Sequence, residues 1–219
     1  AGDERAFNHR QLAYKILATT GRPDLHDARS GVQISQAQAI EEVAPTKPNV
    51  VSDGGLKHAG KGFAYGTFGT WEPGREWAQI TPEELSYARP IWDGYLHRPS
   101  GILLAGIIPG VYNSSTRAEL AGLISALAKP IALHIALDNK SVADRACAIA
   151  EGSHLHRKPW RLLSDGDLWC IVAQLIDARG PEATRISWTK GHAGWQWIAS
   201  QPDNATTVAN GQADFAASK

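Results

Sequence analysis

The feature that most constrains the fold is an apolar run of strand length, IALHIAL at residues 131–137, between two segments of helical periodicity. The run is apolar except for His134, which predicts a strand covered on both faces. Residues 115–129 come before it and place Leu120, Leu123, Ile124 and Leu127 on one stripe of a helix. Residues 141–152 follow it as a second predicted helix, which ends at Gly152. A buried strand flanked by amphipathic helices indicates an α/β sheet with helices packed on it.

The other segments extend this pattern to a mixed sheet of five strands. Further strands are predicted at 49–53, 62–71, 102–112 and 184–188. A strong helix is predicted over 167–180 and a weaker one over 210–218. The predicted fold class is therefore α/β, because helices alternate with the later strands.

Two stretches lie outside this regular order. Residues 1–48 are interpreted as an N-terminal extension or linker with short helices, for which 9–17 and 35–43 are the candidates. Residues 49–219 form the predicted main domain. Within it, residues 71–99 are rich in proline and aromatic residues and are interpreted as an ordered insertion with one short helix.

Charge and cysteine content limit the function classes only weakly. The 22 basic residues balance 22 acidic ones, so only a local patch can argue for a nucleic-acid partner. Cys147 and Cys170 form no disulfide framework, which favours a reducing, intracellular compartment, cytoplasmic or nuclear. The first residues are polar, and no apolar stretch has the length of a membrane helix, so neither a signal peptide nor a membrane partner is expected. No residue is methionine, so a piece of a longer chain is expected.

Four acidic residues stand at positions where a site could form. Asp53 ends the first predicted strand, Glu119 lies in the first turn of a helix, Asp138 directly follows the apolar strand, and Asp214 lies in the last helical segment. Each also has a purely structural interpretation. Asp53 could belong to a turn with Gly54, Thr116 and Glu119 could form a capping box, Asp138 could cap the next helix, and Asp214 could be a solvated side chain.

Convergence of such acids would require a cation, because clustered carboxylates repel one another. Hard oxygen ligands favour Mg²⁺ or Mn²⁺. Asp138 fits this hypothesis best, since sites in α/β sheets form beyond the carboxyl ends of strands.

Six motifs in order resemble those of one family, type 1 ribonuclease H, over about residues 49–218. The motifs are SDGG at 52–55, TRAEL at 116–120, LDNKSV at 137–142, DLW at 167–169, SWTKGHAG at 187–194 and NGQAD at 210–214. The resemblance implies a ribonuclease H-like fold, a five-stranded mixed sheet with helices. With its upstream extension, its insertion and no initiator methionine, the chain looks like a domain from a retroelement polyprotein, in which an upstream reverse transcriptase is the expected partner.

The resemblance also implies roles for residues of this chain. Asp53, Glu119, Asp138 and Asp214 match four metal-binding carboxylates, and His192 matches a mobile histidine near the scissile phosphate. The positions that match a nucleic-acid groove are Arg117 and Asn210, with Ser115 and Thr116 where many members have two asparagines, and Ser114 in a DNA-phosphate pocket.

The implied reaction is hydrolysis of the RNA strand of an RNA–DNA hybrid by two Mg²⁺ ions, for which Mn²⁺ can substitute. The products would be a 5′-phosphate and a 3′-hydroxyl. A basic stretch with Arg157, Lys158 and Trp160 matches the position of a substrate-binding handle in some members, or is a solvated loop with one packed tryptophan. Trp169 and Trp188 lie in periodic elements and are predicted to be core residues.

Two other functions stay open from the sequence. One is a non-catalytic domain of the same fold that binds nucleic acid or supports a reverse transcriptase. The other is a different nuclease or an integrase-like enzyme of the wider fold. Retention of all four acids and of the KGHAG motif favours the ribonuclease hypothesis.

Overall fold

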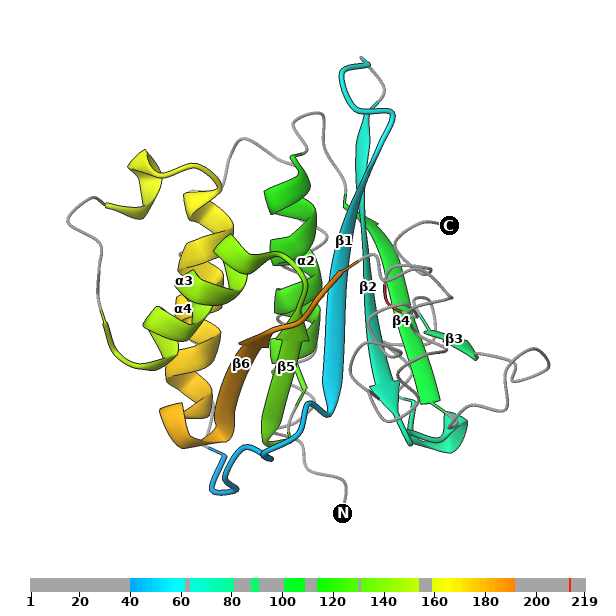
Figure 1. Cartoon of the computed structure of the whole chain (residues 1–219), viewed down its shortest axis with the longest axis vertical. Coiled ribbons are helices and arrows are strands. Elements are labelled where there is room, and N and C mark those ends of the chain that lie inside the picture. The colour runs from blue at the N-terminus through cyan, green and yellow to red at the C-terminus, as the bar shows by residue number, and fades with distance from the viewer. Residues whose placement is uncertain are drawn as a thin grey trace.

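The computed structural model describes residues 40–61, 64–80, 88–90, 101–108, 114–129, 131–153, 159–191 and Ala213. A mixed sheet of six strands lies at the centre of these residues, in the spatial order β3-β4-β2-β1-β5-β6 (Figure 1). The strands are β1 (Val50–Lys57), β2 (Tyr65–Pro73), β3 (Ala88–Pro90), β4 (Gly101–Ile108), β5 (Leu133–Leu137) and β6 (Thr184–Trp188). Neighbours β1, β2, β4 and β3 pair antiparallel, whereas β1, β5 and β6 pair parallel.

The predicted α/β class and mixed sheet are confirmed, and the architecture agrees with the fold that the motifs implied. The five predicted strands are present with shifted ends. The sixth strand, β3, has only three residues and comes from the predicted insertion at 71–99. The predicted insertion thus adds a strand to the sheet beside β4. The turn-rich composition of residues 71–99 did not predict this strand.

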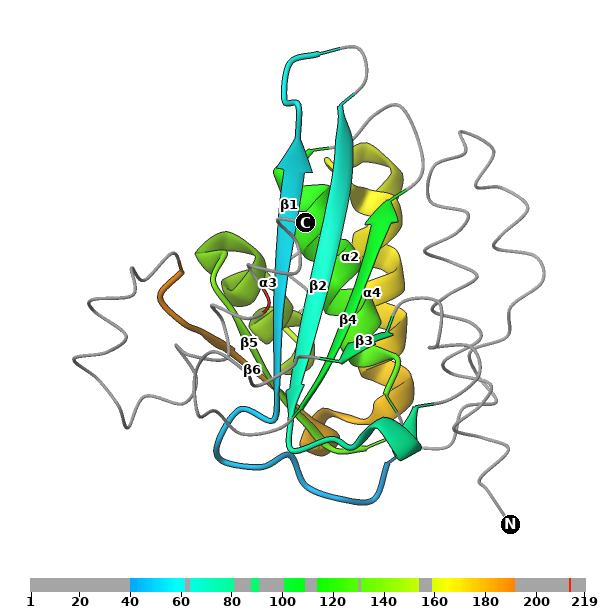
Figure 2. The same ribbon diagram turned by 90° about the vertical axis from the view of Figure 1, so that its right-hand side faces the viewer.

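Among the described residues, three long helices pack together on the sheet. They are α2 (Ser115–Leu127), α3 (Lys140–Ala150) and α4 (Gly166–Arg179), and the short 3₁₀ helices are η2 (Trp77–Gln79), η3 (Trp160–Leu162) and η4 (Pro181–Ala183). Figure 2, which looks onto β1, β2 and β4, shows α2 and α4 behind these strands. None of the described helices is long and apolar enough to cross a membrane.

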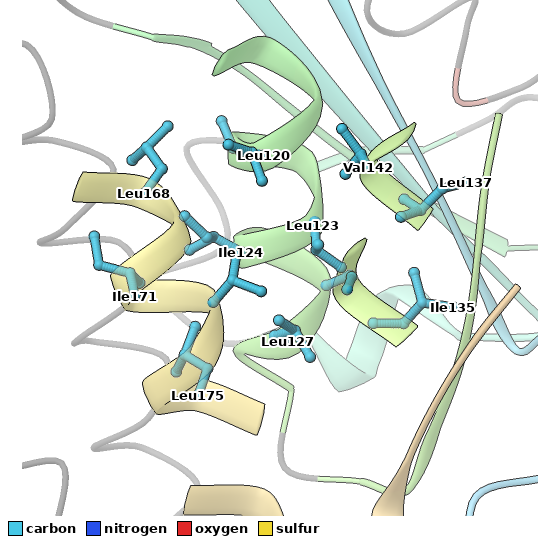
Figure 3. Packing of buried hydrophobic residues seen from close by; sticks show 14 of the residues in the cluster. Leu120, Leu123, Ile124, Leu127, Ile135, Leu137, Val142, Leu168, Ile171 and Leu175 are labelled. Atoms are coloured by element: carbon cyan, nitrogen blue, oxygen red, sulfur yellow. The ribbon is translucent and has the colours of Figure 1, made fainter. Parts of the chain in front are cut away.

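The main core lies between α2, α4 and the sheet. Leucine and isoleucine side chains of α2 face those of α4, while Ile135 and Leu137 of β5 and Val142 of α3 pack on α2 from the other side (Figure 3). The facing residues of the two helices are Leu120, Leu123, Ile124 and Leu127 with Leu168, Ile171 and Leu175. Full burial of one such side chain contributes about 1.5–3 kcal/mol, so this cluster is the principal source of stability for the helical layer.

Two glycines allow α2 to lie directly on β1. A Cβ atom at Gly54 would stand 2.2 Å from the backbone nitrogen of Glu119, and one at Gly122 would stand 2.4 Å from Ser52 Oγ. Both distances are far inside van der Waals contact. The backbone of α2 therefore lies directly against β1, at positions on both sides of Glu119.

A buried arginine ties the ends of several elements together. The Arg179 side chain, 1% exposed, donates hydrogen bonds to the carbonyl oxygens of Leu127, the last residue of α2, and of Lys129 and Ile131, which follow the helix. Its own carbonyl accepts from the backbone N–H of Ile40, and Ala44 N–H bonds Glu182 O at 2.8 Å. Residues 40–43 are not helical, so the helix predicted over 35–43 is wrong for that part, whereas 9–17 lies outside the described residues.

Candidate metal centre

Three of the four predicted acids come together at the centre of the sheet. Asp53, Glu119 and Asp138 each offer a carboxylate oxygen, and these oxygens all lie within 4.8 Å of one another. Asp53 lies in β1, Glu119 in the second turn of α2, and Asp138 directly after β5. Residues more than eighty positions apart thus form one acidic cluster.

The pairing of β1 with β5 explains the position of the two aspartates. The strands run parallel, with Ser52 opposite Leu137, so Asp53 and Asp138 are the next residues of two adjacent strands. Asn49 fixes this register at the other end. Its side-chain amide donates to Ala132 O at 3.0 Å, and its Oδ1 accepts from His134 N at 2.8 Å.

Burial makes the cluster electrostatically demanding. Asp53 is 4% exposed and Glu119 is 6% exposed, and Asp138 is half-buried. The Gly54 backbone N–H donates to Asp53 Oδ1 at 2.8 Å. A hydrogen bond from a backbone amide offsets only part of the repulsion between close carboxylates that are largely buried.

The donor set fits a hard divalent cation. All three ligand groups are carboxylates, with no histidine or thiolate among the described members, which matches the oxygen ligands of Mg²⁺ and Mn²⁺. Asp53, Glu119 and Asp138 are the described residues that would hold the ion. A cation held by these residues would supply positive charge, which stabilises the charge that develops in reactions at a phosphate.

The end of β6 and the residues directly after it lie against Asp138. Thr189 N–H donates to Leu137 O at 2.8 Å, and Trp188 Nε1 donates to the carbonyl oxygen of Asp138 at 2.9 Å. A Cβ atom at Gly191 would stand 2.2 Å from Asp138 Oδ2, so only glycine leaves room for the carboxylate there. Neither contact was predicted from the sequence, although glycine at 191, within the KGHAG motif, was a signal of close approach.

The prediction that Trp169 and Trp188 are core residues is confirmed for Trp169 and wrong for Trp188. Trp169 is 2% exposed and belongs to the main core. Trp188 is 51% exposed, because it is the last residue of β6 and its ring lies beside the acidic cluster instead of under the helices. Strand periodicity identified the element but could not tell which end of it would be covered.

Five predicted site residues lie outside the described residues. They are His192, Asp214, Asn210, Arg157 and Lys158. Ala213, the residue before Asp214, is fully buried with Val51, Trp71 and Ala136. These side chains belong to the second core cluster, on β1, β2 and β5.

The predicted nucleic-acid residues at the start of α2 are engaged within the protein. Ser114 is the N-cap, and its Oγ accepts from Arg117 N at 3.0 Å, so the capping box with Thr116 as its cap is wrong. Ser114 Oγ also lies 3.2 Å from Asp165 Oδ2. Ser115 is exposed and Thr116 is half-buried.

Arg117 joins the first turns of α2 and α4. Its guanidinium donates to Asp167 at 2.6 and 3.0 Å and to Asp165 at 3.3 Å. Burial alone would lower the pKa of Arg117, but hydrogen bonds and charges from Asp167 and then Asp165 together raise it above its ordinary value. Asp165 and Asp167 were not predicted, although an Asp-Gly-Asp sequence at a helix start indicated a possible partner for an arginine.

Trp160 is half-buried in η3 and packs against the main core. The Cζ atom of Arg145 lies 6.0 Å from the centre of its ring and 4.4 Å from that of Trp169. This arrangement agrees with the interpretation of a packed tryptophan. The basic residues before it, Arg157 and Lys158, lie outside the described residues.

Comparison with known proteins returned one solved structure and no family. No protein-family model matches the chain, and no curated protein matches it. The solved structure is prototype foamy virus protease–reverse transcriptase, with 18% sequence identity and a TM-score of 0.45 over 83% of this chain. The chain spans 22% of the length of that protein. At this level of similarity the function has to be argued from the site.

Proposed function

We propose that the chain is an endonuclease that hydrolyses the RNA strand of RNA–DNA hybrids with bound Mg²⁺. The observation that carries the proposal is the convergence of Asp53, Glu119 and Asp138 within 4.8 Å. These acids belong to three motifs of the ribonuclease H type and come from three separate elements. A cluster of this kind is costly to bury unless it holds a cation, which supports a catalytic over a purely structural role.

The bound ions would supply charge stabilisation at the scissile phosphate and an activated water. Asp53 and Glu119 are buried and held by the close contact of β1 with α2, so their carboxylates are positioned before any ligand binds. Asp138 is the more accessible acid and stands at the open end of β5. Asp214 is proposed as the fourth carboxylate of the same shell.

His192 is proposed to carry a proton, not to bind metal. It is the residue directly after Gly191, and Gly191 contacts Asp138. An imidazole with an ordinary pKa near 6.5 can accept or release a proton around neutral pH. The acids already supply the hard ligands, so the role that remains for His192 is to accept a proton from the attacking water or to donate one to the leaving oxygen.

Hybrid recognition is proposed to depend on shape, phosphate and 2′-hydroxyl contacts. Ser114, Ser115, Thr116 and Asn210 are the proposed contacts in the groove, with Arg157, Lys158 and Trp160 as a further basic surface. Arg117 is proposed to hold the residues of the nucleic-acid groove in position instead of contacting the hybrid. Its guanidinium is already bonded to Asp167 and Asp165. An upstream reverse transcriptase domain is proposed as the partner within a longer chain.

The decisive experiment compares Asp138→Asn with Asp144→Asn on a labelled RNA–DNA hybrid. Asp144 is a matched control, because it is the same residue type but 60% exposed and paired with Lys140 on α3. Asp138→Asn should lower Mg²⁺-dependent cleavage by more than about a hundredfold, which exceeds the usual cost of losing an outer-shell partner of a metal. Asp144→Asn should cleave like the wild type.

Duplex DNA and duplex RNA serve as the substrate controls. Equal cleavage of duplex DNA would indicate another nuclease of the wider fold. Hybrid binding by the wild-type protein without any cleavage in Mg²⁺ or Mn²⁺ would indicate a non-catalytic domain. Full activity of Asp138→Asn would contradict the assignment of the site.

A further inference from the structure

An acidic-rimmed groove lies on the helical layer, apart from the metal centre. It has a volume of about 1110 Å³ and is formed by the end of α3, the start of η3, the outer face of α4 and η4. Its lower surface includes Ile149, Trp160, Ala173 and Ile176. The first and last of these are buried and belong to the main core, so the groove has a rigid apolar base.

Three exposed carboxylates surround this base. Glu151 follows α3, Asp177 lies on the last turn of α4, and Glu182 lies in η4. Among the described residues that line the groove, none is basic. An apolar base with an acidic rim would bind an amphipathic segment that carries positive charges beside its apolar face.

The groove and the acidic cluster lie at opposite ends of α3. The helix begins at Lys140, two residues after Asp138, and ends at Ala150, beside Glu151. Ten residues of helical rise separate these ends by about 15 Å. A ligand in the groove would therefore not contact the metal centre.

The chain itself enters the domain at the rim of this groove. Ile40 N–H bonds the carbonyl oxygen of Arg179 at 3.0 Å, and Ala44 N–H bonds that of Glu182 at 2.8 Å. Glu182 is one of the three rim carboxylates. Residues before position 40 are therefore tethered within a short distance of the groove, at a high effective concentration.

The sequence before this tether contains a segment with the required chemistry. Residues 5–23 include Arg5, Arg10, Lys15 and Arg22 and no acidic residue. Within them, HRQLAYKIL at 9–17 has Leu12, Ile16 and Leu17 at helical spacing. The linker from 18 to 39 can span about 70 Å when fully extended, at roughly 3.3 Å per residue, so its length does not limit docking.

We propose that residues 9–17 dock as an amphipathic helix into the groove of the same chain, with Arg10 and Lys15 near the acidic rim. The apolar side chains would cover Ile149, Ala173 and Ile176. The docked segment would give the N-terminal extension a fixed position on the helical layer. This inference does not depend on the proposed nuclease activity.

Cys170 provides a direct test, because it lines the groove and is half-buried. A docked helix would shield its thiol, and access controls the rate at which a thiol is alkylated. In the full-length protein, Arg10→Glu with Lys15→Glu should release the segment and accelerate Cys170 alkylation by at least about fivefold. Mass spectrometry of peptides reads Cys170 and Cys147 separately, and Cys147, which does not line the groove, should keep its rate.

Arg22→Glu with Arg29→Glu is the matched control, since it makes the same change in charge outside 9–17. Restored protection when Arg10→Glu/Lys15→Glu is combined with Glu151→Lys/Glu182→Lys would establish direct charge pairing. Equal alkylation rates in the wild type and in Arg10→Glu/Lys15→Glu would overturn the proposal. Equal acceleration by the control pair would do so too, and protection that is lost on dilution would assign the occupant to a second copy of the chain.

Discussion

At the residue scale, Gly191 determines how much space the Asp138 carboxylate has. An added Cβ would lie 2.2 Å from Oδ2 and 2.8 Å from both Cβ and Cγ of Asp138. A methyl group there would force the carboxylate away from Asp53 and Glu119, since the obstructing atoms belong to a short side chain that cannot bend aside. The position of one carboxylate of the acidic cluster therefore depends on a residue that carries no functional group.

Gly191→Ala is expected to weaken Mn²⁺ binding by about tenfold or more, in the range seen when the support of a metal ligand is removed. Isothermal titration with Mn²⁺ measures the effect without reference to cleavage. Gly60→Ala is the matched control, because an added Cβ at Gly60 meets no atom within 4 Å. Its positive φ predicts a loss of stability of about 1 kcal/mol and unchanged Mn²⁺ affinity. A Mn²⁺ affinity of Gly191→Ala equal to that of the wild type would show that the Asp138 carboxylate can be accommodated in another position.

His192→Ala and Asp53→Asn should differ in severity. If His192 carries a proton and Asp53 holds metal, the histidine variant should lose about 10²–10⁴-fold in turnover but keep measurable cleavage. Asp53→Asn should leave almost none. Single-turnover assays between pH 6 and pH 9 separate the two, because only the histidine variant should change the shape of the pH profile. Equal loss in both variants would contradict the division of roles.

The sequence predicted individual acids better than it predicted their neighbours. Asp53, Glu119 and Asp138 were identified from motifs and from strand ends, and the structure brings them together. The partners of Arg117 and the exposure of Trp188 were not predicted. Both features depend on the contact between two elements that are distant in sequence. Local periodicity does not predict such contacts.

At the element scale, Arg179 joins the ends of α2, α4 and the segment before β1. It donates to three carbonyl oxygens and to Thr184 Oγ1, which starts β6. Burial lowers its pKa to about 9, so the guanidinium still carries its charge at neutral pH. The charge strengthens each hydrogen bond to these carbonyls.

Arg179→Ala is expected to lower the free energy of unfolding by about 3 kcal/mol or more, because buried carbonyl oxygens would lose their donors. Arg179→Lys should recover only part of this loss, since an ammonium group cannot reproduce the planar fork of donors. Urea denaturation measures both. Arg185→Ala on the exposed face of β6 is the control and should change stability by less than about 0.5 kcal/mol. A similarly small effect at Arg179 would show that water replaces the guanidinium.

The elements themselves were largely predictable, because α2, α3, α4 and β5 have strong periodicity and clear ends. The short strand β3 and the non-helical residues 40–43 were not. Both are stabilised by pairing with distant segments, β4 in one case and the backbone of Arg179 and Glu182 in the other. Tertiary contacts of this kind override local propensity.

At the scale of the whole molecule, the acidic cluster should reduce the stability of the metal-free protein. Three carboxylates within 4.8 Å repel one another, and two of them are nearly buried. In the absence of metal, Asp138→Asn should therefore be more stable than the wild type by about 1 kcal/mol, the size of one close charge interaction near a protein surface with allowance for screening.

The same variant should lose the stabilisation that metal gives. Wild-type protein should show a higher Tm in Mn²⁺ than in EDTA, because an ion that binds only the folded state stabilises it. Asp138→Asn should show little difference between the two conditions, whereas Asp144→Asn should respond like the wild type. Scanning calorimetry of the full chain makes both comparisons. Lower stability of Asp138→Asn in EDTA would show that its carboxylate is a structural partner, not a strained ligand.

The direct contact of β1 with α2 at Gly54 and Gly122 has a consequence for selection experiments. In a library displayed on a surface and sorted only for folded protein, both glycines should be retained, because any side chain would meet backbone or a buried hydroxyl. Positions 53, 119 and 138 should instead accept neutral residues and even gain from them. Sorting the same library for cleavage should restore the three acids. The difference between the two sorted populations would map the residues that the proposed cleavage requires, and the two glycines would be retained in both populations.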